Sequence, residues 1–401
     1  MRIKKFSMIG VTFVMALGLV AGTASAISSA SASPRAHVGP TSLPISAFTN
    51  NFSVMKTLRG LEKAGKGKIA AILPDTVSST RYVEFDAPYI TKALEAAGVP
   101  KSQFVVQNAL GSATTELTDA ETDITNGATV LLMDGLNSGV GAEIEGYARV
   151  HGVAVIDYDR ISLGGSRTYY VSFNNVQVGT LIGKGFVSCV SAWHVAKPKV
   201  VVLHGAATDN NATLFAQGYN KVIQPYFSSG KWSLVARTAD TWTPDVALTG
   251  FEAVYTAHPN TNAAVIPNDA NAAPIITYLQ KHGVKAKTFP TTGQDASLTG
   301  LDNILSGYQC GTVYKPIYLE AGAAVALALY LRAGEKPPSN LVNGKVEDTV
   351  ENVAVPSILM KPEWVTPANM KATVIKDNFV PAKQLCAGTY KAACIAAGIT
   401  P

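Results

Sequence analysis

Apolar, strand-like runs alternate with helical patterns from residue 69 to residue 359 of this chain. Such alternation is typical of parallel sheets whose strands are joined by right-handed helical crossovers. The pattern occupies both halves of the chain, so we predict an α/β protein with two related lobes. The strand candidates are Ile69–Leu73, Phe104–Gln107, Thr129–Met133, Val153–Tyr158, Tyr169–Phe173, Val200–His204, Ser233–Arg237, Ala263–Ile266, Lys287–Pro290, Thr312–Tyr314 and Val353–Leu359.

Length and charge support this division and exclude one class of partner. The chain has 401 residues, of which 47% are hydrophobic and 15% charged. A single hydrophobic core stops growing at roughly 250–300 residues, which favours two lobes. The net charge is +5, and Arg2, Lys4 and Lys5 supply three of these charges, which leaves +2 for the rest. Without a basic run elsewhere, we expect no nucleic-acid partner.

The first 26 residues have the pattern of a secretory signal peptide. A basic start precedes an apolar run from Met8 to Val20, and small residues follow at Ala24–Ala26. A membrane anchor is the alternative, but the run is short for a span of ~20 residues. Residues 27–66 are expected to be a tether and lead-in, rich in Ser, Ala and Pro at first. We therefore expect a periplasmic or secreted protein.

Four cysteines bear on lipid attachment and on disulfides. The first is Cys189, so no cysteine near the expected cleavage site could carry a lipid, and we expect no lipoprotein. An even number in an exported chain favours disulfides. Cys386 and Cys394 are expected to pair in a C-terminal tail, residues 381–401. Cys189 and Cys310 either form a second bridge or remain free buried thiols.

Polar and aromatic residues follow the strand-like runs in both halves. In an open α/β sheet, ligands bind outside the carboxyl ends of the strands. The set combines carboxylate acceptors, amides, fixed cations and flat rings, a mixture that suits the hydroxyls and C–H faces of a small polyol. Its members are Asp75, Arg81–Tyr82, Asp159–Arg160, Asp209–Asn211, Trp242, Asn268–Asp269, Gln294–Asp295 and Lys315. Simple packing for Trp242 and a surface ion pair for Asp159–Arg160 are the alternatives.

Motifs for other chemistries are absent from the sequence or incomplete. Gly60-x4-Gly65-Lys66-Gly67 imitates a phosphate loop, but it lacks the Ser or Thr that would hold magnesium and it precedes a strand. The six histidines show no metal-ligand spacing. Asp159, Asp269 and Asp295 could supply a glycosidase carboxylate pair, yet each adjoins a donor or an amide, which suits hydroxyl binding better. We expect no cofactor, no metal and no enzymatic activity.

Several stretches resemble the periplasmic sugar-binding proteins of ABC importers. They are DYDR (157–160), VSFNN (171–175), DNNATLFAQG (209–218), TWTPD (241–245), PNDANA (267–272), GQDA (293–296), TVYKPI (312–317) and VIKDNF (374–379). The resemblance implies a type I periplasmic binding protein, in which two Rossmann-like lobes with parallel sheets are joined by a three-crossover hinge. Lobe 1 would comprise residues 67–173 plus 316–348, and lobe 2 residues 174–315 plus 349–380.

The resemblance also implies a function and a set of contacts. The protein would capture a monosaccharide between its lobes and deliver it to an ABC permease in the inner membrane, as a monomer. D-Xylose is the first candidate, glucose or another aldohexose the alternative, and a secreted glycosidase a remoter one. The ligand-binding residues implied are Arg81, Tyr82, Asp159, Arg160, Asp209, Asn211, Trp242, Asn268, Asp295 and Lys315. The first-lobe site departs from the family pattern, because Thr76–Thr80 replaces a run rich in basic residues.

Overall fold

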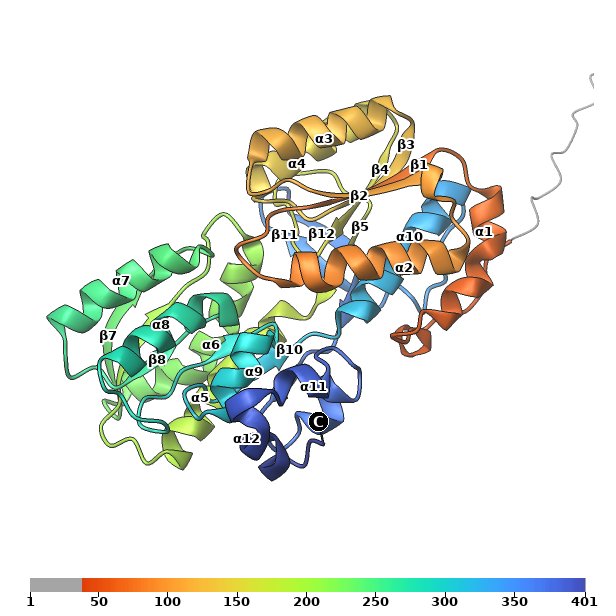
Figure 1. Cartoon of the computed structure of the whole chain (residues 1–401). Helices are drawn as coiled ribbons and strands as arrows, with labels where there is room; N and C mark the ends of the chain where they lie inside the picture. The colour runs from red at the N-terminus through yellow and green to blue at the C-terminus, as the bar shows by residue number, and fades with distance from the viewer. Residues whose placement is uncertain (1–37, 401) are drawn as a thin grey trace, which may run out of the picture. The chain divides into compact units, whose positions relative to one another are not determined.

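The computed structural model describes residues 38–400 (Figure 1). The expected signal peptide, residues 1–26, and the first part of the expected tether lie outside the described residues. The strand–helix alternation predicted from the sequence is present, and the strands gather in two lobes. The α/β fold with mostly parallel sheets is therefore confirmed.

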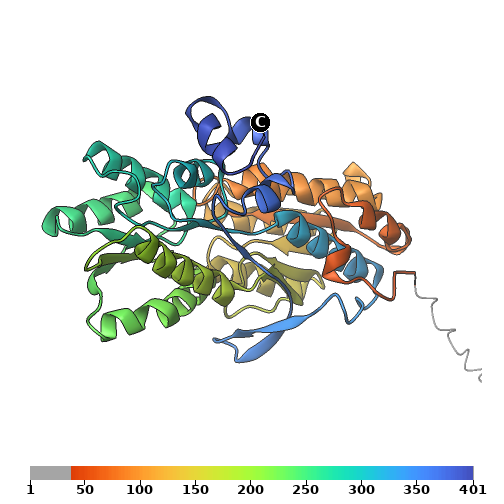
Figure 2. The same ribbon diagram turned by 90° about the horizontal axis from the view of Figure 1, so that it is seen from below.

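The first lobe is built on a seven-stranded sheet of order β11-β12-β5-β4-β3-β1-β2, in which only the β11–β12 pair is antiparallel. The β11–β12 hairpin forms one edge of that sheet and is drawn in light blue in Figure 2. The strands are β1 (Lys68–Leu73), β2 (Phe104–Asn108), β3 (Ala128–Met133), β4 (Ala154–Tyr158), β5 (Tyr169–Phe173), β11 (Gly344–Asp348) and β12 (Val353–Met360).

Helices cover both faces of this sheet, as Figure 1 shows. One face carries α3 (Ala113–Thr125) and α4 (Ser138–Val150), and the other α2 (Ala87–Ala97) and α10 (Ile317–Ala333). Because successive side chains of a strand point to opposite faces, β1 serves two cores. Ile69 packs in the cluster that includes α2 and α10, whereas Ala70 packs in the cluster under α3 and α4. Burial on both faces explains why this strand is apolar from Ile69 to Leu73.

The second lobe contains two three-stranded sheets, of order β7-β6-β8 and β13-β10-β9. A backbone hydrogen bond from Ala264 to Pro290 joins them at 2.9 Å. The strands are β6 (Lys199–Leu203), β7 (Ser233–Thr238), β8 (Ala263–Val265), β9 (Gly293–Gln294), β10 (Thr312–Tyr314) and β13 (Glu363–Val365). The helices are α5 (Asn175–Ala192), α6 (Asn210–Ser228), α7 (Pro244–Ala257), α8 (Asp269–Lys281) and α9 (Leu298–Leu305). The strand expected at Lys287–Pro290 is wrong, since Lys287 adopts a left-handed φ of 60° in a turn.

The chain crosses between the lobes after β5, after β10 and after β12. The first two crossovers fall at Phe173 and Lys315, where the sequence placed them. The third lies later than expected, because β12 pairs in parallel with β5 of the first sheet. Residues 349–360 therefore belong to the first lobe, which corrects the expected boundary at residue 348.

Residues 38–66 do not form the loose lead-in that their composition suggested. They contain the short helices η1 (Ile45–Ala47), η2 (Ser53–Leu58) and α1 (Arg59–Ala64). Leu43 and Phe48 are buried, and Phe48 lies so close to Gly322 of α10 that a Cβ there would clash with its ring. This segment completes the core of the first lobe. Among helices of the described residues, none is both long and apolar enough to cross a bilayer.

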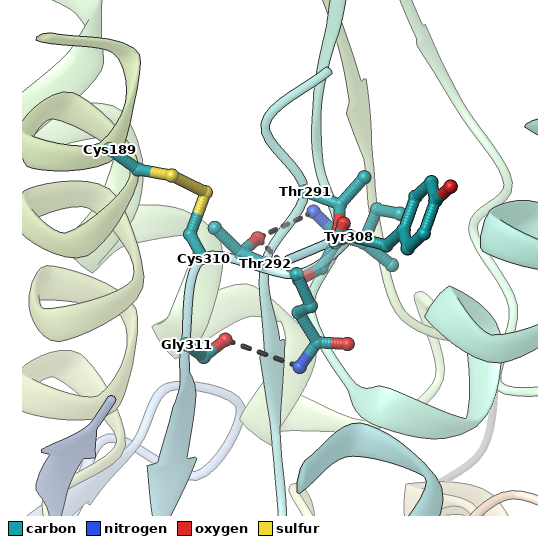
Figure 3. Close-up of a disulfide and its surroundings, with 8 residues drawn as sticks. Cys189, Thr291, Thr292, Tyr308, Cys310 and Gly311 are labelled. Atoms are coloured by element: carbon teal, nitrogen blue, oxygen red, sulfur yellow. Dashed lines mark hydrogen bonds between the residues drawn. A yellow bond between two sulfur atoms is a disulfide. The ribbon is translucent and has the colours of Figure 1, made fainter. Parts of the chain in front are cut away.

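The expected Cys386–Cys394 disulfide is present, and Cys189 and Cys310, for which the sequence left two alternatives, also form a bridge. Cys189 on α5 is joined to Cys310, next to β10, within the second lobe (Figure 3). Cys386–Cys394 closes the C-terminal tail, which holds α11 (Ala382–Leu385), η6 (Gly388–Tyr390) and α12 (Lys391–Ala396). Both tail cysteines are buried, and α11 packs against α9. The tail is thus fixed to the second lobe. Preceding it, η5 (Lys371–Ile375) follows β13.

Candidate functional site

All ten residues that the family resemblance implied as ligand contacts line a single cavity at the carboxyl ends of the strands, between the two lobes, whereas Asp75, Asn210 and Asp269 of the strand-end set do not line it. The cavity is small in this conformation, with only about 20 Å³ open to the centre of a water-sized sphere. The lining residues are Ser78, Ser79, Arg81, Tyr82, Asp159, Arg160, Asp209, Asn211, Phe215, Trp242, Asn268, Gln294, Asp295 and Lys315.

Asp75 shapes the loop that follows β1. Its Oδ1 accepts hydrogen bonds from the backbone N–H of Val77 at 2.8 Å and of Ser78 at 2.7 Å. Its Oδ2 accepts a further bond from Ser78 Oγ at 2.7 Å. Asp side chains bond to their own backbone two or three residues on in turns of this kind. The turn presents Ser78 and Ser79 to the cavity.

Arg81 lines the cavity, but carboxylates hold its guanidinium. Its Nε and Nη2 donate to Asp86 at 2.8 and 2.7 Å. Nη2 also donates to Glu320 at 2.7 Å, and Nη1 to Asp159 at 2.9 Å. Burial opposes the charge of Arg81, yet the three carboxylates keep its pKa above the usual value. Arg81 is therefore placed to fix the orientation of Asp159.

Asp159 directly follows β4 and has a left-handed φ of 57°. A non-glycine residue in this region is strained, and such strain clusters at functional sites. Its Oδ2 accepts a hydrogen bond from the Tyr82 hydroxyl at 3.1 Å, and Lys315 Nζ lies 3.9 Å from Oδ1. Although burial alone would raise it, the charges of Arg81, Lys315 and Arg160 lower the pKa of Asp159 to about 2. Asp159 thus offers a fully ionised acceptor.

Arg160 extends from the first lobe toward the second. Its Nη2 donates to the Tyr82 hydroxyl at 3.0 Å and to Ser78 Oγ at 3.3 Å. Its Nε lies 3.4 Å from Asp209 Oδ2 in the second lobe and 3.6 Å from buried Asp134. Burial raises the pKa of Asp134 well above its usual value. The surface ion pair considered for Asp159–Arg160 is wrong, since both side chains are buried.

Asp209 orients the aromatic wall of the second lobe. Its Oδ1 caps α6 by accepting from the Asn211 backbone at 2.8 Å. Its Oδ2 accepts from Trp242 Nε1 at 2.9 Å. The indole ring lies edge-on to Phe215, with centroids 6.3 Å apart, and a Cβ at Gly205 would clash with it. The ring is thereby held in one orientation beside the cavity.

Several hydrogen bonds join the lobes around the cavity, among them one from Asn211 Nδ2 to the Asp159 carbonyl at 3.0 Å. Ser79 Oγ donates to Asp295 Oδ2 at 2.7 Å, and Asn268 Nδ2 donates to the Ser78 carbonyl at 2.9 Å. Another runs from the backbone N–H of Ser138 to the Thr208 carbonyl at 3.1 Å. The lobes are therefore closed on each other in this conformation.

Asp295 occupies in the second lobe a place similar to that of Asp159 in the first. It follows β9 directly, and its φ of 96° is also positive. Its Oδ1 lies 3.1 Å from Lys315 Nζ, at the second crossover. Next to it, Gln294 Oε1 is buried and accepts no hydrogen bond from the described residues. An acceptor of this kind needs a donor from a ligand or water, because an unpaired buried polar group is costly.

The cavity is suited to binding rather than to proton transfer. Carboxylates, cations and amides surround it, and an indole forms one wall. No group of His, Cys, Asp and Glu among residues 38–400 could hold a metal ion.

Sequence reasoning assigned no contact to four lining residues: Ser78, Ser79, Phe215 and Gln294. The first two lie in the run Thr76–Thr80, whose small polar composition gave little signal. Gln294 was already among the polar residues at the strand ends, although no contact was assigned to it. Phe215 lies within the DNNATLFAQG stretch, so a closer reading of that stretch could have found it.

This chain is similar to known proteins in both its sequence and its fold. Residues 69–336 match the family described as periplasmic binding protein domain. The chain is 35% identical to the D-xylose-binding periplasmic protein of Escherichia coli over 73% of this chain and 86% of that one. It is 34% identical to the protein of the same name from Haemophilus influenzae, over 68% and 80%.

A crystal structure of a carbohydrate transporter solute-binding protein from Chloroflexus aurantiacus, in complex with D-glucose, also resembles this chain. The two superpose with a TM-score of 0.70 and are 25% identical, and the alignment covers 79% of this chain and 97% of that one.

Proposed function

This chain belongs to the periplasmic binding protein family, and we propose that it captures D-xylose between its two lobes and delivers it to an ABC permease. Its relatives are sugar-binding periplasmic proteins of ABC transporters and not enzymes, and this chain is a sugar-binding protein of the same kind. The choice of D-xylose, the monomeric state, the export signal in residues 1–26 and the absence of a lipid anchor are parts of the proposal.

One observation carries the proposal: ten polar and aromatic residues from both lobes converge on one small, buried cavity. Each hydroxyl of a sugar both donates and accepts, and here cations and amides stand beside carboxylates. Charge-assisted bonds of this kind are the strong ones. The Trp242 ring offers an apolar wall for the C–H face of the sugar.

Two relatives support xylose, since they carry the name of D-xylose-binding proteins and cover most of this chain. The small cavity volume also favours a pentose, which lacks the hydroxymethyl group of a hexose. Glucose is the second candidate, because the Chloroflexus aurantiacus protein of similar fold was crystallised with D-glucose. A site that pairs every buried hydroxyl rejects sugars that lack one, and a closed wall rejects sugars with an extra group.

A thermal-shift and calorimetric panel of D-xylose, D-ribose, L-arabinose, D-glucose and D-galactose tests the proposal. A ligand at ~100 times its dissociation constant adds ~2.7 kcal/mol to stability. D-Xylose should give the largest shift and the lowest Kd. A larger shift with D-glucose would replace the pentose by a hexose, and no shift with any of the five would refute sugar binding. Incubation with aryl xylosides should release no phenol, whereas steady release would indicate a glycosidase.

A further inference from the structure

Asp159 and Arg160 are neighbours in the sequence, yet both side chains line the sugar cavity. In an extended strand, consecutive side chains point to opposite sides. A tight turn resolves this conflict, because the Arg160 backbone N–H donates to the Tyr158 carbonyl at 2.7 Å and Asp159 has a φ of 57°. Three-residue turns whose central residue has a positive φ are rare and strained. The turn therefore needs support from the residues around it.

The support comes from β5, the neighbouring strand of the first sheet. Tyr170 and Ser172 lie two residues apart on it, so their side chains point to the same face. The Tyr170 hydroxyl and Ser172 Oγ both donate to the Asp159 carbonyl, each at 2.8 Å. The backbone N–H of Asp159 donates to the Val171 carbonyl at 2.9 Å. Residues 170–172 thus hold both polar groups of the Asp159 backbone.

Asn175, at the start of α5, fixes the direction of the two hydroxyls. Its Nδ2 donates to the Tyr170 hydroxyl at 3.0 Å and to Ser172 Oγ at 3.4 Å. An amide nitrogen only donates and a carbonyl oxygen only accepts. Each hydroxyl accepts from Asn175 and directs its own hydrogen to the Asp159 carbonyl. Because Tyr170 and Ser172 are 0% exposed, water cannot replace these bonds.

The second lobe supplies a third donor to the same carbonyl. Asn211 Nδ2, on α6, donates to the Asp159 carbonyl at 3.0 Å, and Asn211 Oδ1 accepts from Asn175 Nδ2 at 2.8 Å. A carbonyl oxygen has two lone pairs, so three donors exceed its capacity. Loss of one hydroxyl leaves both lone pairs with a donor. Loss of both hydroxyls leaves Asn211 as the single donor and one lone pair unpaired.

We propose that Tyr170 and Ser172 are positioning residues for sugar binding, which act through the strained turn at Asp159. Neither residue lines the sugar cavity. By fixing the Asp159 carbonyl, they keep the Asp159 carboxylate and the Arg160 guanidinium directed at the sugar. Their effect on sugar affinity rests on the proposed function, whereas their hold on the turn does not.

Calorimetry with D-xylose measures the positioning. Because the carbonyl keeps two donors in each single variant, Tyr170→Phe or Ser172→Ala should raise the Kd about two- to threefold, and the double variant at least about tenfold. The matched control is the double variant Tyr330→Phe, Ser357→Ala. These two side chains of the first lobe are also 0% exposed, and their hydroxyls donate to backbone carbonyls at 2.6 and 2.7 Å, away from the cavity lining. The control should lower the melting temperature without changing the Kd.

A spectroscopic measurement follows the carbonyl directly and needs no sugar. Asp159–Arg160 is the only Asp–Arg step in the sequence, so ¹³C at the backbone carbonyl of Asp and ¹⁵N in Arg give one correlated NMR peak, from this peptide bond. The carbonyl shift of that peak reports the hydrogen bonds that the oxygen accepts. The peak should move in Tyr170→Phe and in Ser172→Ala, and stay in place in the control variants.

A double variant that folds and binds D-xylose with the wild-type Kd would overturn the inference, as would a carbonyl peak that stays in place in both single variants. An equal loss of affinity in the control double variant would assign the effect to stability alone and also overturn it. If the double variant does not melt cooperatively, wild-type Kd values in both single variants have the same meaning. A wild type that binds no sugar, with a peak that moves as expected, would instead refute the proposed function and leave the hold on the turn intact.

Discussion

The hydrogen bond from Trp242 to Asp209 allows the two roles of the indole to be separated. Trp242→Phe keeps an aromatic wall beside the cavity but removes the Nε1–H that donates to Asp209 Oδ2 at 2.9 Å. Trp242→Ala removes both. If the ring and the donor each matter, the two variants should weaken D-xylose binding by different amounts.

The size of each effect follows from the contacts. A hydrogen bond to a charged group contributes roughly 1.5–3 kcal/mol. Because Asp209 is 3% exposed, water can do little to replace the lost bond. Part of this lost free energy lowers the stability of the unliganded protein and not the affinity for sugar, because Asp209 also caps α6. We expect Trp242→Phe to raise the D-xylose Kd about tenfold, which corresponds to ~1.4 kcal/mol. Trp242→Ala should cost a further ~1–3 kcal/mol, in the range of aromatic binding hot spots.

Calorimetry with D-xylose measures both Kd values, and intrinsic fluorescence should change on sugar binding only while Trp242 is present. Trp232→Phe is the matched control. Trp232 is also buried, but it packs against Phe186 and Tyr226 at a distance from the cavity lining. It should lower the melting temperature without altering the Kd. Equal Kd values for wild type, Trp242→Phe and Trp242→Ala would refute the role of the indole.

Three further predictions address charge, pH and the tail. Asp295→Asn keeps the shape of the side chain and tolerates the positive φ, yet it should weaken D-xylose binding at least about tenfold while the protein still melts cooperatively; unchanged affinity would remove Asp295 from the contacts. Burial raises the pKa of Glu116 to about 7, so between about pH 4.5 and pH 7 the folded state holds a proton that the unfolded chain has lost, and stability falls as pH rises. In urea titrations, Glu116→Gln should reduce this fall by roughly 1–3 kcal/mol, and identical pH profiles would contradict the argument. Replacing Cys386 and Cys394 by serine should lower the free energy of unfolding by roughly 2–3 kcal/mol without changing sugar affinity, and non-reducing peptide mapping of the wild type should recover the linked pair.

Local patterns predicted much of the fold because apolar strands and capped helices are encoded over short stretches. Asn268, for example, follows an apolar run and caps α8 through its own side chain, a signal contained within four residues. Short strands carried less information. Lys287–Pro290 resembled a strand, but the chain turns there and the strand β9 begins only at Gly293.

The sequence predicted which residues line the site, but not which of them bond to one another. Position at strand ends predicted that Asp159 and Asp295 line the cavity, because in each lobe ligands bind outside the carboxyl ends of the parallel strands. The carboxylates that hold Arg81 could not be predicted in the same way. Glu320 lies 239 residues further along the chain, and its position near the start of the largely apolar α10 indicated burial without indicating a partner. Similarly, Ser79 became part of the site only because the other lobe faces it.

The Cys189–Cys310 bridge has a mechanical consequence. It closes a loop of 121 residues in sequence separation that contains β6 to β9 and α6 to α9. At roughly 3.3–3.6 Å per extended residue, this loop contains about 400 Å of contour length, which a pulling force cannot extend while the disulfide is intact. Stretching from the termini would extend the oxidised chain by that much less than the reduced chain. The same stretch could pass a narrow pore only as a doubled strand.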